Sequence, residues 1–324
     1  MNSQPHKVGL VIEGGAMRGV ISMAFLAVLE KYQFTQAFHH VWGSSAGAIN
    51  AAYFLAGQAE SGLTLYLEDA DPGQYFRKWR PWNVLDVDAI LEKVSGARPP
   101  LNCNKLRANR TKAVVPLTEA RTGQSVAVSL NGPDERIYRV LRAAISIPPY
   151  RNTPVELDGT AFLDGGIADP IPINAALEAG CTQIVVLLTR PAGFMPRKLT
   201  WRERALLRVA VLPKTPEFRR VFLHVRPEQY LASRRLALGQ SKTTSAAQIW
   251  AFTPPAALAK VYRFGNDPRF LREVAQQCIE EAEKVVADPL FLPDGRGDAN
   301  QRENGSGQLG NAERRVSQKI ELLA

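Results

Sequence analysis

The chain has 324 residues, of which 45% are hydrophobic and 22% are charged, and its formal net charge at pH 7 is +9. This is the composition of a globular protein of one or two domains, and its three widely spaced cysteines exclude a disulfide framework and a zinc cluster. No stretch reaches the roughly 18 apolar residues of a membrane span and no signal-peptide pattern opens the chain, so we expect a cytoplasmic protein.

Hydrophobic periodicity predicts strands that alternate with helices along most of the chain. The predicted strands cover residues 8–12, 40–42, 112–117, 125–130, 183–188 and 248–252, with a hairpin at 155–163. The predicted helices cover residues 20–32, 46–56, 136–145, 173–179 and 268–287, whereas the forty residues after 56 are predicted to be irregular. This alternation is typical of an α/β sandwich around a largely parallel sheet.

A glycine-rich turn, residues 13–19, separates the first predicted strand from the first helix. Glycines let the backbone approach a ligand closely, and free amides at a helix N-terminus favour negative charge. If the first two strands pair in parallel, the amides of Gly14, Gly15 and Ala16 face the turn that follows the second strand. These three amides are candidates for the oxyanion hole of an acyl-transfer enzyme.

The same turn approximates the G-x-G-x-x-G pattern of dinucleotide-binding proteins, with Ala16 in the place of the second glycine. That interpretation needs an acidic residue at the end of the second strand to hold a ribose. The strand ends instead in Trp42-Gly43-Ser44. We therefore expect no nucleotide cofactor.

The turn after the second strand, Gly43-Ser44-Ser45-Ala46-Gly47, has the G-x-S-x-G pattern of a nucleophile elbow. Ser45 is the candidate nucleophile, and a small-residue turn without catalysis is the alternative. A nucleophilic serine also needs a base, which must come from elsewhere in the chain.

Three aspartates in one later segment are candidates for that base. Asp158 is accounted for by the Asp-Gly turn of the predicted hairpin, and Asp169, which precedes a proline, is suited to begin a turn. Asp164 ends the second arm of the hairpin, just before Gly165-Gly166, where the backbone can turn sharply. Asp164 is therefore the candidate base, with a plain turn as the alternative.

A histidine base is the other possibility, because α/β-hydrolases also use G-x-S-x-G, in the chain order Ser, Asp, His. His224 is the only histidine that follows Ser45. It lies in a basic segment without a loop signature, so a surface or half-buried structural role is the favoured interpretation of His224.

Three motifs in this order resemble those of the patatin-like phospholipases. They are G-G-x-x-R-G after the first strand, G-x-S-x-G after the second and D-G-G beyond a hairpin, and the resemblance extends over residues 7–190. It implies a three-layer α/β/α sandwich with a central, largely parallel sheet. It also implies an enzyme that cleaves acyl esters of lipids with a Ser–Asp dyad, without histidine, metal or cofactor.

The resemblance also implies roles for individual residues. It makes Ser45 the nucleophile and Asp164 the base, and it assigns the oxyanion hole to the amides of residues 14–16. Arg18 matches the basic position of the glycine motif, where it steadies the loop or meets a phosphate. The family usually has a third glycine where this chain has Ala16, and the alanine Cβ predicts a backbone without positive φ. A non-catalytic lipid- or partner-binding module is the alternative function.

Residues 197–235 hold eleven Lys or Arg and three Glu, a local balance of +8. Thr200-x-x-Glu203 predicts a capped helix start, and apolar residues such as Trp201 are interspersed with the charges. We expect this segment to touch an anionic membrane surface, and a solvated helical surface is the alternative. We expect no nucleic-acid partner, because no recognised binding module accompanies the charge.

The composition changes near the C-terminal end. Residues 1–292 are expected to form the acyl hydrolase domain. Residues 293–324 are polar and rich in glycine, which predicts a disordered tail.

Overall fold

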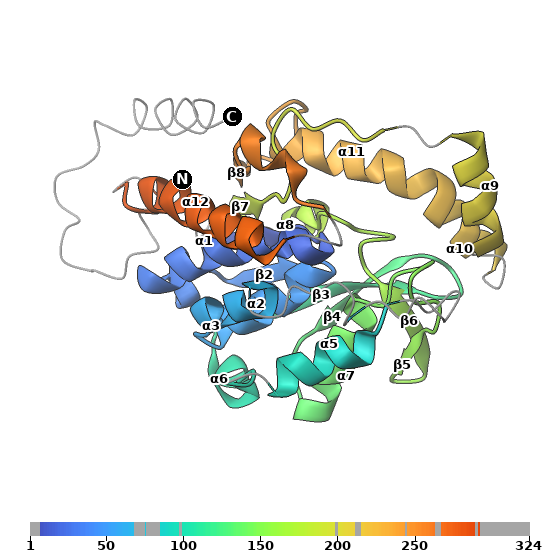
Figure 1. The fold of residues 1–324 in the computed structure, drawn as a ribbon, viewed down its shortest axis with the longest axis horizontal. Coiled ribbons are helices and arrows are strands. Elements are labelled where there is room, and N and C mark those ends of the chain that lie inside the picture. Colours follow the sequence, from blue (N-terminus) through green and yellow to red (C-terminus); the bar gives the residue numbers. More distant parts are fainter. Residues whose placement is uncertain are drawn as a thin grey trace.

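Within the residues that the structure describes, eight strands form one central sheet (Figure 1). The computed structural model describes residues 7–67, 75, 85–96, 99–197, 200–210, 215–243, 245–262, 267–288 and 291. The strands are β1 (Val8–Ile12), β2 (His40–Gly43), β3 (Lys112–Glu119), β4 (Ser125–Ser129), β5 (Val155–Leu157), β6 (Thr160–Asp164), β7 (Gln183–Leu187) and β8 (Gln248–Phe252). Five of them pair in parallel in the order β3-β2-β1-β7-β8, and β4, β6 and β5 join through antiparallel pairs.

Helices cover both faces of this sheet. Alternate residues of β1 enter separate cores: Leu10 and Ile12 belong to the larger one, with α1, α2 and α12, whereas Val11 belongs to the other, with α8 and α11. The chain is thus a three-layer α/β/α sandwich with a largely parallel sheet, as predicted (Figure 1). The helices on the larger core are α1 (Gly19–Lys31), α2 (Ala46–Leu55), α3 (Ala59–Leu67), α5 (Val87–Gly96), α6 (Cys103–Ala108), α7 (Asp134–Ala144) and α12 (Pro268–Val286), and those on the opposite face are α8 (Ile173–Glu178) and α11 (Arg226–Ala237).

Every strand and helix that the sequence predicted is present, with ends that differ by two residues or fewer. The prediction of an irregular stretch over the forty residues after 56 was wrong, because α3 and α5 lie there. Val87, Leu91 and Val94 are buried at helical spacing along α5. Prolines and tryptophans nearby obscured that short period, and residues 76–84, the centre of this Pro- and Trp-rich stretch, lie outside the described residues.

Strand β3 brings two distant parts of the chain end to end. Val114 pairs with both β2 and β4, and Leu117 pairs with both β6 and β4. Because β4 occupies one edge of β3 at both residues, β2 and β6 share the other edge. Strand β2 is parallel to β3 and β6 is antiparallel to it, so the carboxyl ends of β2 and β6 point toward each other. The turn that holds Ser45 therefore meets the turn that follows Asp164.

The basic segment forms helices at one end of the molecule (Figure 1). Helices α9 (Trp201–Ala210) and α10 (Pro216–Arg220) and a π-helical turn, η3 (Val221–Val225), lead into α11. The predicted capping box at the start of α9 is present: the Thr200 amide donates to the Glu203 carboxylate at 2.8 Å, and the Glu203 amide donates to the Thr200 hydroxyl at 3.3 Å. No helix within the described ranges is both long enough and apolar enough to cross a membrane. The predicted tail at 293–324 lies outside those ranges.

Candidate active site

Ser45 occupies the sharp turn between β2 and α2, with φ 55° and ψ −127°. A positive φ is uncommon for a residue with a side chain and costs about 1–3 kcal/mol, and such residues gather at functional sites. This is the geometry of a nucleophile elbow, which presents the serine hydroxyl above the strand ends. The buried Ser44 hydroxyl donates to the Asp169 carbonyl at 2.9 Å, which ties the elbow to the turn after β6.

The glycine turn after β1 lies directly against this elbow. A Cβ added to Gly14 would lie 2.6 Å from the Cβ of Ser45, closer than real Cβ atoms approach, so only glycine fits there. The parallel pairing of β1 with β2, on which the oxyanion prediction depends, is present. Among the described residues, none accepts a hydrogen bond from the amides of Gly14, Gly15 or Ala16. Three adjacent donors are thus available beside the serine.

Ala16 differs from the sequence expectation. Its φ is 52°, so the prediction of a backbone without positive φ at this residue was wrong. The left-handed conformation costs an L-residue roughly 1–2 kcal/mol but does not forbid it. Ala16 begins the short 3-10 turn η1 (Ala16–Arg18) and lines the pocket described below, so the space beside it is open to its methyl group.

Asp164 is fully buried at the end of β6 and meets the elbow. Its Oδ2 accepts a hydrogen bond from the Ser45 hydroxyl at 2.8 Å, and its Oδ1 accepts one from the Gly166 amide at 2.7 Å. A Cβ at Gly165 would overlap the Pro116 carbonyl of β3, so the turn passes close to the sheet only because that residue is glycine. Both carboxylate oxygens are therefore held in place.

Glu13, which the sequence did not single out, fixes the start of the glycine turn. It is buried, and its Oε2 accepts the Thr189 amide at 2.5 Å while its Oε1 accepts the Tyr230 hydroxyl at 3.0 Å. Burial raises the pKa of Tyr230, and the Glu13 carboxylate raises it further, so the phenol keeps the proton that it donates. The hydroxyl of Thr189 also donates to the Gly14 carbonyl at 3.2 Å.

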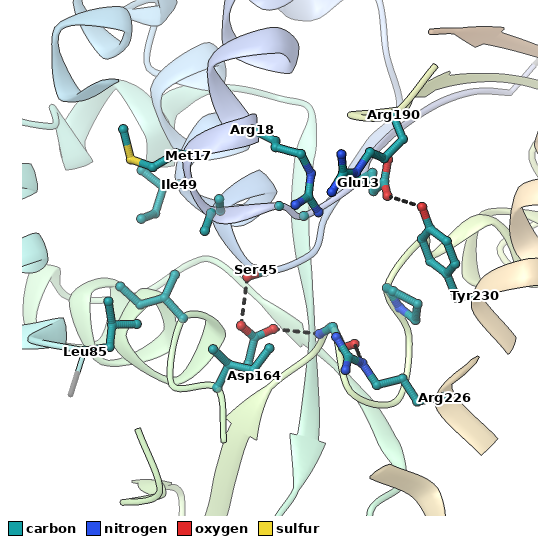
Figure 2. A pocket seen from close by; sticks show the side chains of 18 of the residues that line it. Glu13, Met17, Arg18, Ser45, Ile49, Leu85, Asp164, Arg190, Arg226 and Tyr230 are labelled. Carbon is teal, nitrogen blue, oxygen red and sulfur yellow. Dashed lines mark hydrogen bonds between the residues drawn. The ribbon is translucent and has the colours of Figure 1, made fainter. Parts of the chain in front are cut away.

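A pocket of about 580 Å³ opens over Ser45 and Asp164, a volume typical of small-molecule sites (Figure 2). The figure places apolar side chains on one side of Ser45 and basic side chains on the other. The labelled apolar residues are Met17, Ile49 and Leu85, and the labelled basic residues are Arg18, Arg190 and Arg226. The pocket can thus hold a ligand with one apolar and one anionic part.

The remaining sequence candidates lie elsewhere. Asp158 and Gly159 form the hairpin turn between β5 and β6 and both have positive φ, as an Asp-Gly hairpin requires. His224 is exposed on η3 and is not among the described residues that line the pocket. Asp169 is buried at the end of the turn that follows β6, and burial, with a smaller contribution from Glu178, raises the pKa of its carboxyl to about 7. Within the described part of the chain, no three His, Cys, Asp or Glu side chains cluster as metal ligands would.

Comparison with known proteins shows a family match for about half of the chain. Residues 10–177 match the family described as patatin-like phospholipase. YjjU of Escherichia coli K12, an uncharacterised protein, is 28% identical over 192 residues, which cover 58% of this chain and 54% of that protein. The chain thus spans about half the length of that relative.

Two solved structures resemble this one. VipD from Legionella pneumophila has a TM-score of 0.52 at 12% identity, over 99% of this chain and 76% of that chain. Human group IVD cytosolic phospholipase A2, solved with methyl γ-linolenyl fluorophosphonate, has a TM-score of 0.46 at 13% identity, over 98% of this chain and 60% of that chain. The similarity to VipD supports the fold.

Proposed function

Because this chain belongs to the patatin-like phospholipase family, we propose that it is a serine acyl hydrolase that cleaves the acyl esters of lipids. One contact carries the proposal: the Ser45 hydroxyl donates to the Asp164 carboxylate at 2.8 Å, in a pocket with an apolar side. Ser45 is the nucleophile and Asp164 the general base, a dyad that needs no histidine.

In the proposed reaction, Asp164 accepts the proton of the Ser45 hydroxyl as Oγ attacks the ester carbonyl carbon. The carbonyl oxygen becomes negative, and the amides of Gly14, Gly15 and Ala16 donate to it; such donors are typically worth about 10²–10³ each in rate. The C–O bond breaks, the alcohol leaves with the proton from Asp164, and the acyl group stays on Ser45. Water then attacks the acyl-enzyme, Asp164 accepts its proton, and the fatty acid is released as Oγ recovers a proton.

The two sides of the pocket suit the two parts of a lipid ester. The apolar side takes the acyl chain, whose burial is favourable by roughly 0.8 kcal/mol per CH₂ group. On the basic side, Arg18 and Arg190 face the alcohol part and favour one that carries a phosphate, since guanidinium groups bind phosphate in a planar, bidentate way. Arg18, buried within the glycine turn, steadies that turn and contacts the phosphate. Phospholipids and lysophospholipids are therefore the proposed substrates.

Helix α9 is the proposed membrane contact within the basic segment. Large apolar side chains are normally covered, yet three are exposed along this helix: Trp201 by 74%, Leu206 by 64% and Val209 by 51%. Arg202 and Arg208 are exposed on the same helix. Such a mixture suits the anionic cytoplasmic leaflet, where each basic residue contributes about 1 kcal/mol. Arg204 of α9 lines the pocket, so a lipid surface on α9 adjoins the pocket. The protein is proposed to act in the cytoplasm, peripherally at the membrane.

A serine-reactive fluorophosphonate probe and a panel of phospholipid, lysophospholipid and simple esters test the enzymatic proposal. We expect the probe to label Ser45 in the wild-type protein. Ser45→Ala should lose both labelling and hydrolysis, since removal of a hydrolase nucleophile can cost on the order of 10⁶ in kcat. Asp164→Asn keeps the shape of the side chain but cannot take the proton, so kcat should fall by about 10²–10⁴.

Two substitutions serve as controls, with folding checked by circular dichroism. Asp158→Asn preserves the hairpin turn, and His224→Ala changes an exposed residue, so both should stay within a few-fold of wild-type turnover. A wild-type protein that neither takes the probe nor hydrolyses any ester of the panel would favour a non-catalytic lipid- or partner-binding module. An inactive His224→Ala beside an active Asp164→Asn would favour an α/β-hydrolase triad.

A further inference from the structure

One face of α11 contacts three loops at the pocket. Arg226, Tyr230 and Arg234 are spaced four residues apart, and residues at this spacing lie on the same side of a helix. Each of the three side chains donates a hydrogen bond to a different loop. The loops come from chain positions far apart, so α11 is a common support for them.

Arg226 supports the turn that carries the proposed base. Its Nε donates to the Gly166 carbonyl at 2.8 Å, and the Gly166 amide in turn donates to Oδ1 of Asp164 at 2.7 Å. The carboxylate oxygen that faces Ser45 is the other one, Oδ2. Arg226 thus acts on the turn on the side opposite the serine, and Figure 2 shows this line of contacts from Ser45 to Arg226.

Tyr230, one helical turn further on, supports the proposed oxyanion loop. Its hydroxyl donates to the buried Glu13 carboxylate at 3.0 Å (Figure 2). Glu13 directly precedes Gly14, whose backbone lies against Ser45. The position of the loop amides relative to the serine hence depends on a bond that comes from the same helix as Arg226.

Arg234, a further turn along, supports the third loop. It is buried, and its guanidinium donates to the carbonyls of Pro191 and, at 3.2 Å, Ala192. Its guanidinium carbon lies 5.8 Å from the ring centre of Phe194, which Arg190 approaches at 4.6 Å. Arg190 and Phe194 both line the pocket.

We propose that Arg226 and Tyr230 are positioning residues, which fix the turn after Asp164 and the proposed oxyanion loop relative to each other through one helix, α11. This rests on the proposed function, because it concerns the same Ser45 and Asp164. Neither residue acts on the reacting atoms. Both instead set the distance between the proposed base, Asp164, and the loop amides of residues 14–16. A displacement of about 1 Å in such a geometry can lower the rate by about 10²-fold.

A short, uncharged soluble ester, p-nitrophenyl butyrate, separates positioning from substrate binding, since it has no head group for an arginine to hold. We expect Arg226→Met to lower kcat about 10–100-fold with KM within threefold of wild type. Tyr230→Phe, which removes one hydroxyl, should lower kcat by about tenfold. Arg226→Lys should recover most of the loss, because an ammonium can donate to the same carbonyl. Arg235→Met, an exposed change on the same helix, is the matched control and should leave kcat unchanged.

Amide hydrogen exchange provides a readout that needs no catalysis. We expect faster exchange over residues 164–168 in Arg226→Met than in wild type and in Arg235→Met, at equal melting temperature. An increase in KM with unchanged kcat would instead make Arg226 a substrate contact and overturn the inference. The inference would also be overturned if Arg226→Met lost activity only in proportion to a lower melting temperature. The same holds if both kcat and amide exchange were unchanged in this variant. If the wild-type protein hydrolyses no ester, the proposed function fails, and the exchange measurement alone decides whether Arg226 holds this turn.

Discussion

At the residue scale, two residues that line the pocket have positive φ. Ser45 has this conformation at φ 55°, where the elbow demands it, and Ala16 has it at φ 52°. For Ser45 the proposed functional group is the side chain, so glycine is no alternative. For Ala16 the proposed functional group is the amide, which glycine would supply equally well. The strain at Ala16 is thus separable from its proposed role.

Ala16→Gly should therefore stabilise the protein, by about 1 kcal/mol, because it removes a Cβ from a left-handed conformation. The amide remains, so hydrolysis of a simple ester should be at least as fast as in the wild-type protein. Thermal unfolding and kcat are the measurements.

Ala232→Gly is the opposite control, since Ala232 is exposed within the regular helix α11. There the same change should destabilise by roughly 0.5–1 kcal/mol. If Ala16→Gly lowers the melting temperature as Ala232→Gly does, the left-handed backbone at Ala16 is not strained.

At the element scale, the sequence predicts site residues that lie at the end of a strand. It does not predict contacts that a helix makes with residues far away in the sequence. Asp164 is the last residue of β6 and Ser45 lies two residues beyond the end of β2, and both belong to motifs with a known turn chemistry. Glu13 also follows a strand, but its partners Thr189 and Tyr230 are 176 and 217 residues away. No local pattern connects residues at such distances.

Helix α11 shows the same limit for a whole element. The spacing of Arg226, Tyr230 and Arg234 places them on one face, yet a basic face is equally typical of a solvated surface. Only the packing of α11 over α8 and β8 decides that this face points toward the pocket loops. The basic segment therefore combines an exposed part, α9, with a part whose polar groups face inward.

The end of the turn that follows β6 contains a group that links stability to pH. Burial raises the pKa of Asp169 to about 7, above its ordinary value of 3.8, so the folded protein binds a proton more tightly there than the unfolded chain. This contribution to stability is fully present below pH 4 and is lost as pH rises toward and through 7. Asp169→Asn should remove that dependence and raise the free energy of unfolding at pH 8 by a few kcal/mol, since one pKa unit corresponds to about 1.4 kcal/mol. Thermal unfolding of both proteins at pH 5 and pH 8 measures the difference.

Asp158→Asn is the reference for that comparison, because Asp158 is exposed in the hairpin turn. Its melting temperature should differ from that of the wild type by the same amount at both pH values. An Asp169→Asn protein that is no more stable than the wild type at pH 8 would mean that the buried carboxylate is well solvated.

At the scale of the whole molecule, the exposed apolar residues of α9 predict that the protein binds to a membrane surface. We expect sedimentation with vesicles that contain phosphatidylserine, and weaker sedimentation with vesicles of phosphatidylcholine alone. Replacing Trp201, Leu206 and Val209 together by serine should abolish the binding while p-nitrophenyl butyrate hydrolysis continues. Tyr262→Ser removes a comparably exposed apolar side chain outside α9 and should leave binding intact. Equal binding to both kinds of vesicle, or none, would contradict the membrane contact.

The end-to-end arrangement of β2 and β6 along β3 also has a consequence for the synthesis of the protein. Ser45 and Asp164 are 119 residues apart, and three strands must be paired before the two side chains meet. During synthesis, Ser45 therefore leaves the ribosome long before Asp164 has been added to the chain. In the proposed mechanism, a nascent or truncated chain holds Ser45 without its base, so ester hydrolysis cannot begin until synthesis has passed β6.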